Sequence, residues 1–508
     1  MTYHDPRGRR PPQQYPAGPY GPYPLPGPQW TPPPPKRQTG IIIVSVVAAV
    51  VVIAAAAGVW LWTRGDGGGG TAGGDEHAAA VEAVGAAEVV WQVDQGLAPE
   101  AVGADDHWVT DEHLVRRLPG RVVAYELKTG ETAWELPVGE VDDDRCPSSV
   151  GHSGLRVALL VATGDKSPQT CEKLTVVDIG AGREVFTVDL PPIERVPVRI
   201  DVPVVFGEHV VIPSRAGTRV LAIDDGAVRS TPKPDAACKS TKAALFGDLL
   251  LAQAECDNGK ESDIRLRSFG ADLKMVWEWV TPQGDDGEPL PVLGVLSLDP
   301  LVVELGHSGG DTRLMRVDPG SGRTVRIAEY TGGTRGDYMS ACDGWAMGTC
   351  EMAKVVGDKV ILTTVMVRVN PGDPRAAPGM EATDRRNELV AFDLGTGERA
   401  WRTGIEPGRT LSLVATADGS VAAYRPEDPN GGMGILYSVD PDTGALAPLM
   451  PIGPKAHEDD RLNTHVRSFA FRGDNQLAFL RDGLFVVFTG VHRASSVGDV
   501  DTVAFALP

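Results

Sequence analysis

One arrangement of apolar and polar positions recurs along most of the chain. In "LVAFDLGTGERAWRTG", residues 389–404, an apolar run ends at Asp393, a short turn ends at Gly397, and Trp401 follows four residues later. Runs of β-branched and aromatic residues favour strands, Asp can hold the backbone of a turn, and glycine accepts the positive φ that tight turns need. The pattern therefore predicts a β-hairpin whose aromatic side chain packs where the second strand begins.

Copies of this hairpin occur throughout the chain beyond residue 120. The clear copies are "VVAYELKTGETAWEL" (122–136) and "LTVVDIGAGREVFTVDL" (174–190), and 264–279, "IRLRSFGADLKMVWEW", is a degenerate one. Weaker copies cover 219–230, 314–327 and 436–449. The predicted turn glycines are Gly130, Gly182, Gly226, Gly270, Gly322, Gly397 and Gly444. The intervals between them are 52, 44, 44, 52, 75 and 47 residues.

The spacing of the copies predicts the fold. One hairpin cannot bury its apolar face alone, and intervals of this size are typical of one four-stranded β-propeller blade per copy. Seven hairpins are visible, and the C-terminal strands "SFAFRG", "NQLAFLRDG" and "LFVVFTG" lack the phrase. Pairing them with the isolated strand "VVWQVD" (89–94) would add an eighth blade and close the ring, which removes exposed sheet edges. We predict an all-β propeller over residues 88–508 with eight blades, and seven is the alternative.

The first 87 residues lack this pattern. Residues 1–39 are rich in Pro, Gly, Gln and Tyr and predict a disordered tail. Residues 40–63 contain the uncharged stretch 41–62, which at about 1.5 Å per residue is long enough to span a bilayer core of roughly 30 Å as a transmembrane helix. A cleavable signal peptide is the alternative, although its apolar core normally has only about 7–15 residues. Residues 64–87 predict a Gly- and Ala-rich linker.

Charges around the apolar stretch indicate its orientation. Lys36 and Arg37 precede it, whereas Arg64 alone follows it before Asp66. Because basic residues stay on the cytoplasmic side, the tail is predicted to be cytoplasmic and the propeller extracytoplasmic. The excess of Arg over Lys, 36 against 12, is typical of bacterial genes of high G+C content.

The net charge of the chain excludes one class of partner. It is −20 overall, and residues 1–63 contribute +4, so the remainder carries −24. Such an acidic surface repels phosphate backbones, and we therefore expect no nucleic-acid partner.

All six cysteines follow the apolar stretch, as expected for a disulfide-bonded exported domain. Fifteen connectivities are formally possible. Consecutive cysteines fall between successive hairpin turns, and this order favours local pairs. The predicted disulfides are Cys146–Cys171, Cys238–Cys256 and Cys342–Cys350.

The phrases "AYELKTGETAW" (124–134) and "AFDLGTGERAW" (391–401) resemble the repeat of the PQQ-like β-propellers, a group that includes quinoprotein alcohol dehydrogenases and the envelope assembly factor BamB. In the dehydrogenases, the resemblance implies a quinone at the ring centre beside a disulfide of adjacent cysteines, with calcium held by Glu, Asn and Asp. Here the closest cysteines, Cys342 and Cys350, are eight residues apart, and no C-x-x-C-H haem motif occurs. We therefore predict no cofactor and no catalytic residues.

Candidate metal and hydrolase motifs are also weak. The acidic segments 141–146 and 284–288 could hold calcium but are more typical of solvated loops, and 440–444 coincides with a repeat turn. The nucleophile motif G-x-S-x-G is absent. A glycan hydrolase needs two carboxylates about 5–10 Å apart, which sequence alone leaves open. We therefore expect a non-catalytic scaffold that binds an envelope protein or glycan, with an envelope glycan hydrolase or a quinone-dependent dehydrogenase as the alternative.

The longest interval between hairpins suggests where a partner binds. Two segments rich in Gly and charge, 330–352 and 369–388, carry the excess and predict surface loops. Aromatic residues and Met are enriched at protein interfaces, and a disulfide lowers the ordering cost of binding. The candidate partner-binding residues are Tyr338, Met339, Trp345 and Met347. The alternative is that Trp345 covers a blade edge as part of a small satellite core.

Overall fold

The described part of the chain is all-β in the computed structural model. The chain divides into the units Met1–Ala72 and Gly73–Pro508, and every described residue lies in the second. The described residues are 86–507 except 95–102, 105, 119, 140–145, 163–170, 191–201, 215–216, 232–236, 258, 260–261, 308–311, 331–337, 339, 343–345, 351, 369–384, 405–409, 427–433, 453–475, 490 and 493–499. The predicted tail, span and most of the linker lie outside them, and no helix within them could cross a membrane.

The first described sheets are antiparallel and follow chain order. One contains β3 (His107–Val109), β4 (His113–Leu118), β5 (Arg121–Glu126) and β6 (Thr132–Pro137). The next contains β7 (Arg156–Ala162), β8 (Cys171–Asp178) and β9 (Arg183–Asp189). The third contains β10 (Val204–Phe206), β11 (His209–Ile212), β12 (Arg219–Ala222) and β13 (Val228–Ser230).

Three further four-stranded sheets complete the middle of the chain. The first contains β14 (Cys238–Phe246), β15 (Leu249–Asp257), β16 (Ser262–Phe269) and β17 (Met275–Val280). The second contains β18 (Val292–Leu298), β19 (Leu301–Gly306), β20 (Thr312–Val317) and β21 (Thr324–Tyr330). The third contains β22 (Ala353–Val356), β23 (Lys359–Thr363), β26 (Leu389–Asp393) and β27 (Arg399–Arg402). The short strands β24 (Val367–Arg368) and β25 (Arg385–Arg386) pair with each other. Residues 369–384, between them in the chain, are the part of the predicted insertion 369–388 that lies outside the described residues.

The last strands pair with the first described strand. The sheet order is β1-β35-β33-β32-β28-β29-β30-β31, in which β28 and β32 are parallel and the other neighbours are antiparallel. Its members are β1 (Glu88–Asp94), β28 (Ser412–Thr416), β29 (Ala422–Arg425), β30 (Ile435–Val439), β31 (Leu446–Pro451), β32 (Gln476–Arg481), β33 (Leu484–Thr489) and β35 (Val500–Ala506). A separate pair joins β2 (Gly103–Ala104) to β34 (Val491–His492).

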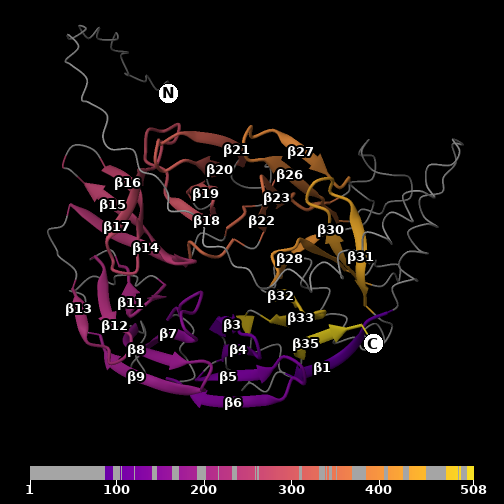
Figure 1. Ribbon diagram of the computed structural model, residues 1–508, viewed down its shortest axis with the longest axis horizontal. Coiled ribbons are helices and arrows are strands. Elements are labelled where there is room, and N and C mark those ends of the chain that lie inside the picture. The colour runs from indigo at the N-terminus through magenta and orange to yellow at the C-terminus, as the bar shows by residue number, and fades with distance from the viewer. Residues whose placement is uncertain are drawn as a thin grey trace, which may run out of the picture. The chain divides into compact units, whose positions relative to one another are not determined.

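Apolar cores lie between successive sheets and close the second unit into a ring. Each sheet shares a core with the next along the chain. The closing core packs Leu114 of β4 against Ala504 of β35, and Arg116 Nη1 donates to Thr502 Oγ1 at 2.7 Å across the same junction. Figure 1 shows the sheets of this unit following one another around the ring, as in a β-propeller.

The predicted pairing of residues 89–94 with the C-terminal strands is confirmed. Strand β1 lies antiparallel to β35, with Trp91 opposite Ala504. Strands β32 and β33 fall within "NQLAFLRDG" and "LFVVFTG", whereas "SFAFRG" lies outside the described residues. The sequence did not predict β35, which lies between β33 and β1.

The repeated turn has the predicted chemistry in β26–β27. Asp393 Oδ1 accepts hydrogen bonds from the backbone N–H groups of Gly395 and Thr396, at 2.9 and 2.8 Å. Gly397 has φ 76°, a left-handed conformation that glycine adopts without a Cβ penalty.

The repeated aromatic residue joins one sheet to the next. Trp401 packs over Gly444 of the following sheet, where an added Cβ would lie 2.5 Å from the indole ring, and its Nε1 donates to the carbonyl of Pro441 at 2.8 Å. Trp134 packs over Gly182 in the same way. These glycines are therefore required both by the backbone conformation and by the ring that lies on them.

The prediction that Gly270 is a turn glycine is wrong. Within the 264–279 hairpin, Leu273 has φ 58° and takes that position. The turn is one residue shorter than in β26–β27, because Gly270 N donates to Lys274 O at 3.0 Å, whereas Asp393 N donates across a longer turn to Glu398 O. The aromatic residue then keeps its place, since Trp277 follows Leu273 by four residues.

Candidate functional site

All three predicted disulfides are present. The S–S distances are 2.09 Å for Cys146–Cys171, 2.03 Å for Cys238–Cys256 and 2.05 Å for Cys342–Cys350. No cysteine is free. The local pairing inferred from the order of cysteines and hairpins is therefore confirmed.

The Cys342–Cys350 loop contacts β18. Of the four strands in its sheet, β18 is the nearest to the interior of the ring (Figure 1). Val295 N donates to Met347 O at 2.8 Å. An added Cβ at Gly294 would lie 2.5 Å from Cys350 Sγ, so glycine makes room for the disulfide.

The tip of this loop reaches two further sheets. A Cβ at Gly348 would lie 3.7 Å from Ala244 Cβ on β14 and 3.8 Å from Val150 Cγ1, in the segment before β7. The loop therefore lies near β14, β18 and the segment before β7, which belong to three different parts of the ring. We infer from these contacts that the loop is directed toward the interior of the ring.

The described candidate side chains of the loop pack into cores. Met347 is fully buried between the β14–β17 and β18–β21 sheets. Tyr338 is half-buried, with its ring edge-on to Phe392 at 5.4 Å between centroids. Neither residue offers an exposed anchor to a partner. Met339 and Trp345 lie outside the described residues, and their role stays a prediction.

A buried carboxylate fixes the start of the loop. Glu304 of β19 is fully buried, and its oxygens accept hydrogen bonds from Ala341 N at 2.9 Å, Cys342 N at 2.7 Å and Ser340 Oγ at 3.1 Å. Burial raises the pKa of Glu304 to about 7, although these three hydrogen bonds oppose the shift. The sequence offered one signal for this contact, a single carboxylate within the otherwise apolar strand "LVVELG".

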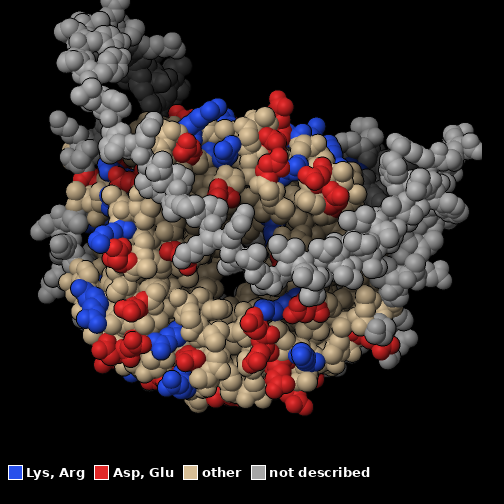
Figure 2. All heavy atoms as spheres, in the orientation of Figure 1, with Lys and Arg blue, Asp and Glu red and all other residues tan. Residues whose placement is uncertain are grey.

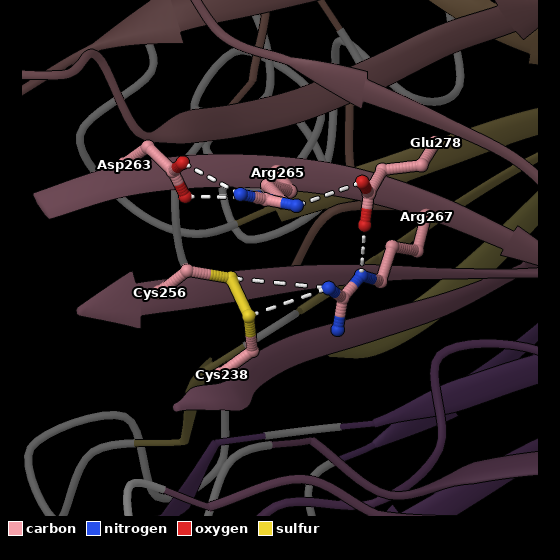
Figure 3. A network of polar contacts seen from close by, with 6 residues as sticks. All are labelled: Cys238, Cys256, Asp263, Arg265, Arg267 and Glu278. Atoms are coloured by element: carbon pink, nitrogen blue, oxygen red, sulfur yellow. Dashed lines mark hydrogen bonds and ion pairs between the residues drawn. A yellow bond between two sulfur atoms is a disulfide. The ribbon is translucent and has the colours of Figure 1, made fainter. Parts of the chain in front are cut away.

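A second group of polar side chains lies on one face of the β14–β17 sheet (Figure 3). Arg265 contacts both oxygens of Asp263, at 2.8 and 2.9 Å, and reaches Glu278 Oε1 at 2.9 Å. Arg267 Nε donates to Glu278 Oε2 at 2.7 Å. Two carboxylates and two guanidinium groups thus form a network without net charge.

The same network contacts the Cys238–Cys256 disulfide. Arg267 Nη2 lies 3.4 Å from Cys238 Sγ and 3.8 Å from Cys256 Sγ (Figure 3). Burial alone would raise the pKa of Glu278, but the hydrogen bonds and charges of Arg267 and Arg265 outweigh it and lower that pKa. Glu278 therefore stays ionised and bound to β16.

Strand β17 exposes apolar side chains at the outer end of this sheet. Met275, Val276 and Val280 are 55%, 59% and 50% exposed, whereas Trp279 is buried and Trp277 half-buried against the next sheet. Among the described residues β17 pairs only with β16. An apolar strand at the end of a sheet offers unpaired backbone groups to another strand.

Other outer strands carry the features that protect sheet edges. Charges and prolines at an edge discourage pairing with a further strand. Such residues are Glu135 and Pro137 on β6, Arg183, Glu184 and Asp189 on β9, Arg326 and Glu329 on β21, Arg399 and Arg402 on β27, and Pro448 and Pro451 on β31. The single charge of β17, Glu278, is already bound by two arginines. The sequence signal was the run "MVWEWV", which we interpreted only as part of a degenerate repeat.

Charge is mixed on the face of the molecule in Figure 2, where acidic and basic side chains alternate instead of forming one patch. The acidic segments behave as turns where they are described. Asp440 accepts from Asp442 N and Thr443 N, and Asp285 pairs with Arg313 at 2.6 Å. Residues 141–145 lie outside the described part, within which no cluster of three or more potential metal ligands occurs.

Comparison with known proteins gives structural similarity only. No protein-family model and no curated protein matches the chain. Similar solved structures include BamB from Moraxella catarrhalis, with 14% identity over 83% of this chain and 100% of that one and a TM-score of 0.42. A quinohemoprotein alcohol dehydrogenase from Pseudomonas putida HK5 has 13% identity over 84% and 76%, with a TM-score of 0.44. A europium-containing methanol dehydrogenase has 11% identity over 83% and 93%, with a TM-score of 0.39. At these identities and TM-scores the neighbours carry no argument about family or activity.

Proposed function

We propose that the chain is a single-pass membrane protein of the bacterial envelope whose exported, eight-bladed propeller is a non-catalytic scaffold. The propeller binds a protein partner through the edge of β17. The exposure of Met275, Val276 and Val280 on one outer strand carries this proposal. The outer strands β6, β9, β21, β27 and β31 carry charged residues or prolines, whereas β17 exposes apolar side chains.

Two observations support export and the blade count. Every cysteine is in a disulfide, as is usual in oxidising compartments. Dividing the eight-stranded sheet at the parallel β28–β32 junction gives β28–β31 and β32-β33-β35-β1, which with the six preceding sheets make eight blades. The membrane anchor is the uncharged stretch 41–62, with the propeller outside the cell membrane.

The absence of catalysis is part of the proposal. The resemblance to quinoprotein dehydrogenases implies a cofactor at the ring centre. In this chain, the Cys342–Cys350 loop is instead directed toward the interior of the ring. The adjacent-cysteine pair of those enzymes is also missing.

Photo-crosslinking in intact membranes tests the binding edge. A photoreactive residue at Val276 or Val280 of the full-length chain should give protein adducts, because both positions are exposed on the proposed edge. The matched control is Val228, which is 51% exposed on the outer strand β13. Adducts of equal yield at all three positions, or none at 276 and 280, would refute the proposed edge.

Protease accessibility tests the orientation independently. Protease added to intact, wall-stripped cells should digest the propeller and spare residues 1–39. A protected propeller would show that the orientation is reversed.

A further inference from the structure

We propose that the Cys238–Cys256 disulfide is a thiol-exchange site, at which a dithiol reduces the cysteine pair and Arg267 stabilises the thiolate that leaves. The proposal goes beyond the scaffold role, because it gives the propeller one reducible bond among its three disulfides. The contact of a single guanidinium group with both sulfur atoms carries it (Figure 3).

The register of the β14–β17 sheet brings the disulfide and the charged network to one face. Cys238 lies opposite Cys256, and Cys256 lies opposite Asp263. Asp263, Arg265 and Arg267 follow one another at steps of two residues along β16, so their side chains point to the same side. Strand pairing therefore places the network beside the sulfur atoms.

Glu278 holds the guanidinium group of Arg267 in position. Arg267 Nε donates to Glu278 Oε2 at 2.7 Å, while Nη2 lies 3.4 Å from Cys238 Sγ and 3.8 Å from Cys256 Sγ. Positive and negative groups alternate along the network, which ends with Arg267 at the disulfide (Figure 3). A thiolate at either sulfur atom would continue this alternation.

The two cysteines differ in exposure, and this difference orders the reaction. Cys238 is half-buried, whereas Cys256 is only 6% exposed. The side chains of Arg267 and Glu278 are 20% and 24% exposed, so solvent reaches this face. A reductant therefore approaches Cys238. Cys256 is the leaving group, and its buried thiolate needs a cation because burial disfavours the charged form.

The other two disulfides have apolar surroundings. Cys146 and Cys171 belong to the core between the β7–β9 and β10–β13 sheets. Cys342 and Cys350 belong to the core between the β18–β21 and β22–β27 sheets. Apolar surroundings disfavour a thiolate, and a poorly stabilised thiolate leaves slowly. We therefore expect these two disulfides to resist exchange.

The proposed exchange balances in two steps. A thiolate of the dithiol attacks Cys238 Sγ, the bond between Cys238 and Cys256 breaks, and Cys256 leaves as a thiolate beside Arg267. The second thiol of the dithiol then loses its proton and attacks the reductant's own sulfur in the mixed disulfide, so that Cys238 leaves and takes up that proton. Two electrons pass to the cysteine pair, and the dithiol becomes a disulfide.

Graded reduction of the detergent-solubilised full-length chain tests the site. Dithiothreitol is added at neutral pH, free thiols are trapped with N-ethylmaleimide at intervals, and peptide mapping follows each disulfide. Cys238–Cys256 should open at least about tenfold faster than either other disulfide, because a stabilised leaving thiolate accelerates exchange. Reduced glutathione, a monothiol, should instead leave a mixed disulfide on Cys238.

Substitution of the guanidinium group separates this role from a structural one. Arg267→Gln should slow the opening of Cys238–Cys256 about tenfold, and Arg267→Lys, which keeps the positive charge, should restore part of the rate. Loss of a merely structural contact would loosen the sheet and speed the opening instead. Arg313→Gln is the matched control, since Arg313 of β20 also pairs with two carboxylates, and it should leave the rate unchanged.

The pH profile of alkylation gives a second measurement on the reduced wild type. The midpoint for Cys256 should lie below about 8.5, the ordinary pKa of a cysteine thiol, and should rise in Arg267→Gln. Equal opening of the three disulfides would overturn the proposal. It would also be overturned if Cys238–Cys256 opened in Arg267→Gln at the wild-type rate or faster.

Discussion

The Cys342–Cys350 loop and strand β17 contain similar residues in opposite environments. Met347 of the loop is fully buried, whereas Met275 of β17 is 55% exposed. From composition, the loop resembles a binding surface because Met, Trp and Gly gather in an insertion. Strand β17 resembles an ordinary packed strand because it belongs to a repeat.

The surroundings of each segment explain why Met347 of the loop is buried and Met275 of β17 is exposed. The loop meets β18, where Gly294 leaves space for the disulfide, and β19, where Glu304 accepts its backbone N–H groups. Strand β17 is the last of its sheet and has no described strand beyond it. Position in the sheet order, more than composition, decides which apolar residues remain exposed.

Introducing a charge into the loop should have the largest effect on stability. Met347→Lys places an ammonium group in the core between two sheets, which should destabilise the fold by more than about 4 kcal/mol. Met347→Leu, which nearly conserves volume, should cost less than about 1.5 kcal/mol. Thermal unfolding of the purified chain measures both. A Met347→Lys protein that melts like the wild type would mean that this side chain faces water.

The buried carboxylate should give the loop a loss of stability with rising pH that β17 does not share. The pKa of Glu304 is raised from about 4.5 to about 7 on folding. Its contribution to stability is therefore fully present below pH 4.5 and is lost as the pH rises through 7. Relative to Glu304→Gln, the wild type should lose up to about 3 kcal/mol across this window.

Unfolding of the wild type and Glu304→Gln at matched pH values isolates this contribution, because other titrating groups cancel in the difference. Glu278→Gln is the control. The stability of the wild type relative to Glu278→Gln should not fall as the pH rises, because the pKa of Glu278 is lowered on folding. A difference between wild type and Glu304→Gln that stays constant from pH 4.5 to 8 would contradict the prediction.

Adding a methyl group at a glycine should change the free energy of unfolding by an intermediate amount near the loop and by little near β17. Gly294→Ala drives a Cβ into the Cys342–Cys350 disulfide and should cost about 2 kcal/mol. Gly270→Ala, at the turn before β17, meets no atom closer than 3.5 Å and should be neutral or slightly stabilising. Urea unfolding curves measure both variants. Equal effects would show that the disulfide can move away from β18.

The hairpins and the disulfides were predictable because local chemistry determines them. Asp393 and Gly397 make one turn within a few residues, and each cysteine pair lies between successive turns. The exception, Gly270, arose because the degenerate turn is one residue shorter and places Leu273 at positive φ. Tertiary packing of the hairpin outweighs that local preference, and the pattern alone does not show the change.

The environments of the candidate sites depended on contacts that are distant in sequence. Gly294 lies 48 residues before Cys342, and Glu304 lies 37 residues before Ala341. The inward path of the loop therefore left no local signal. The exposure of β17 likewise follows from its place at the end of a sheet, although the lack of proline and lysine in "MVWEWV" could have indicated an unprotected edge.

The smallest expected effect on folding is on β17 itself. Met275→Lys makes the same substitution as Met347→Lys, but the exposed side chain already contacts water, so stability should change by no more than about 0.5 kcal/mol. The lysine also adds charge to an apolar edge, and aggregation of the purified chain on heating should decrease. Thermal unfolding and light scattering on the same sample measure the two effects. A fall in stability comparable to that of Met347→Lys would show that Met275 is packed against protein, and the contrast between loop and edge would then disappear.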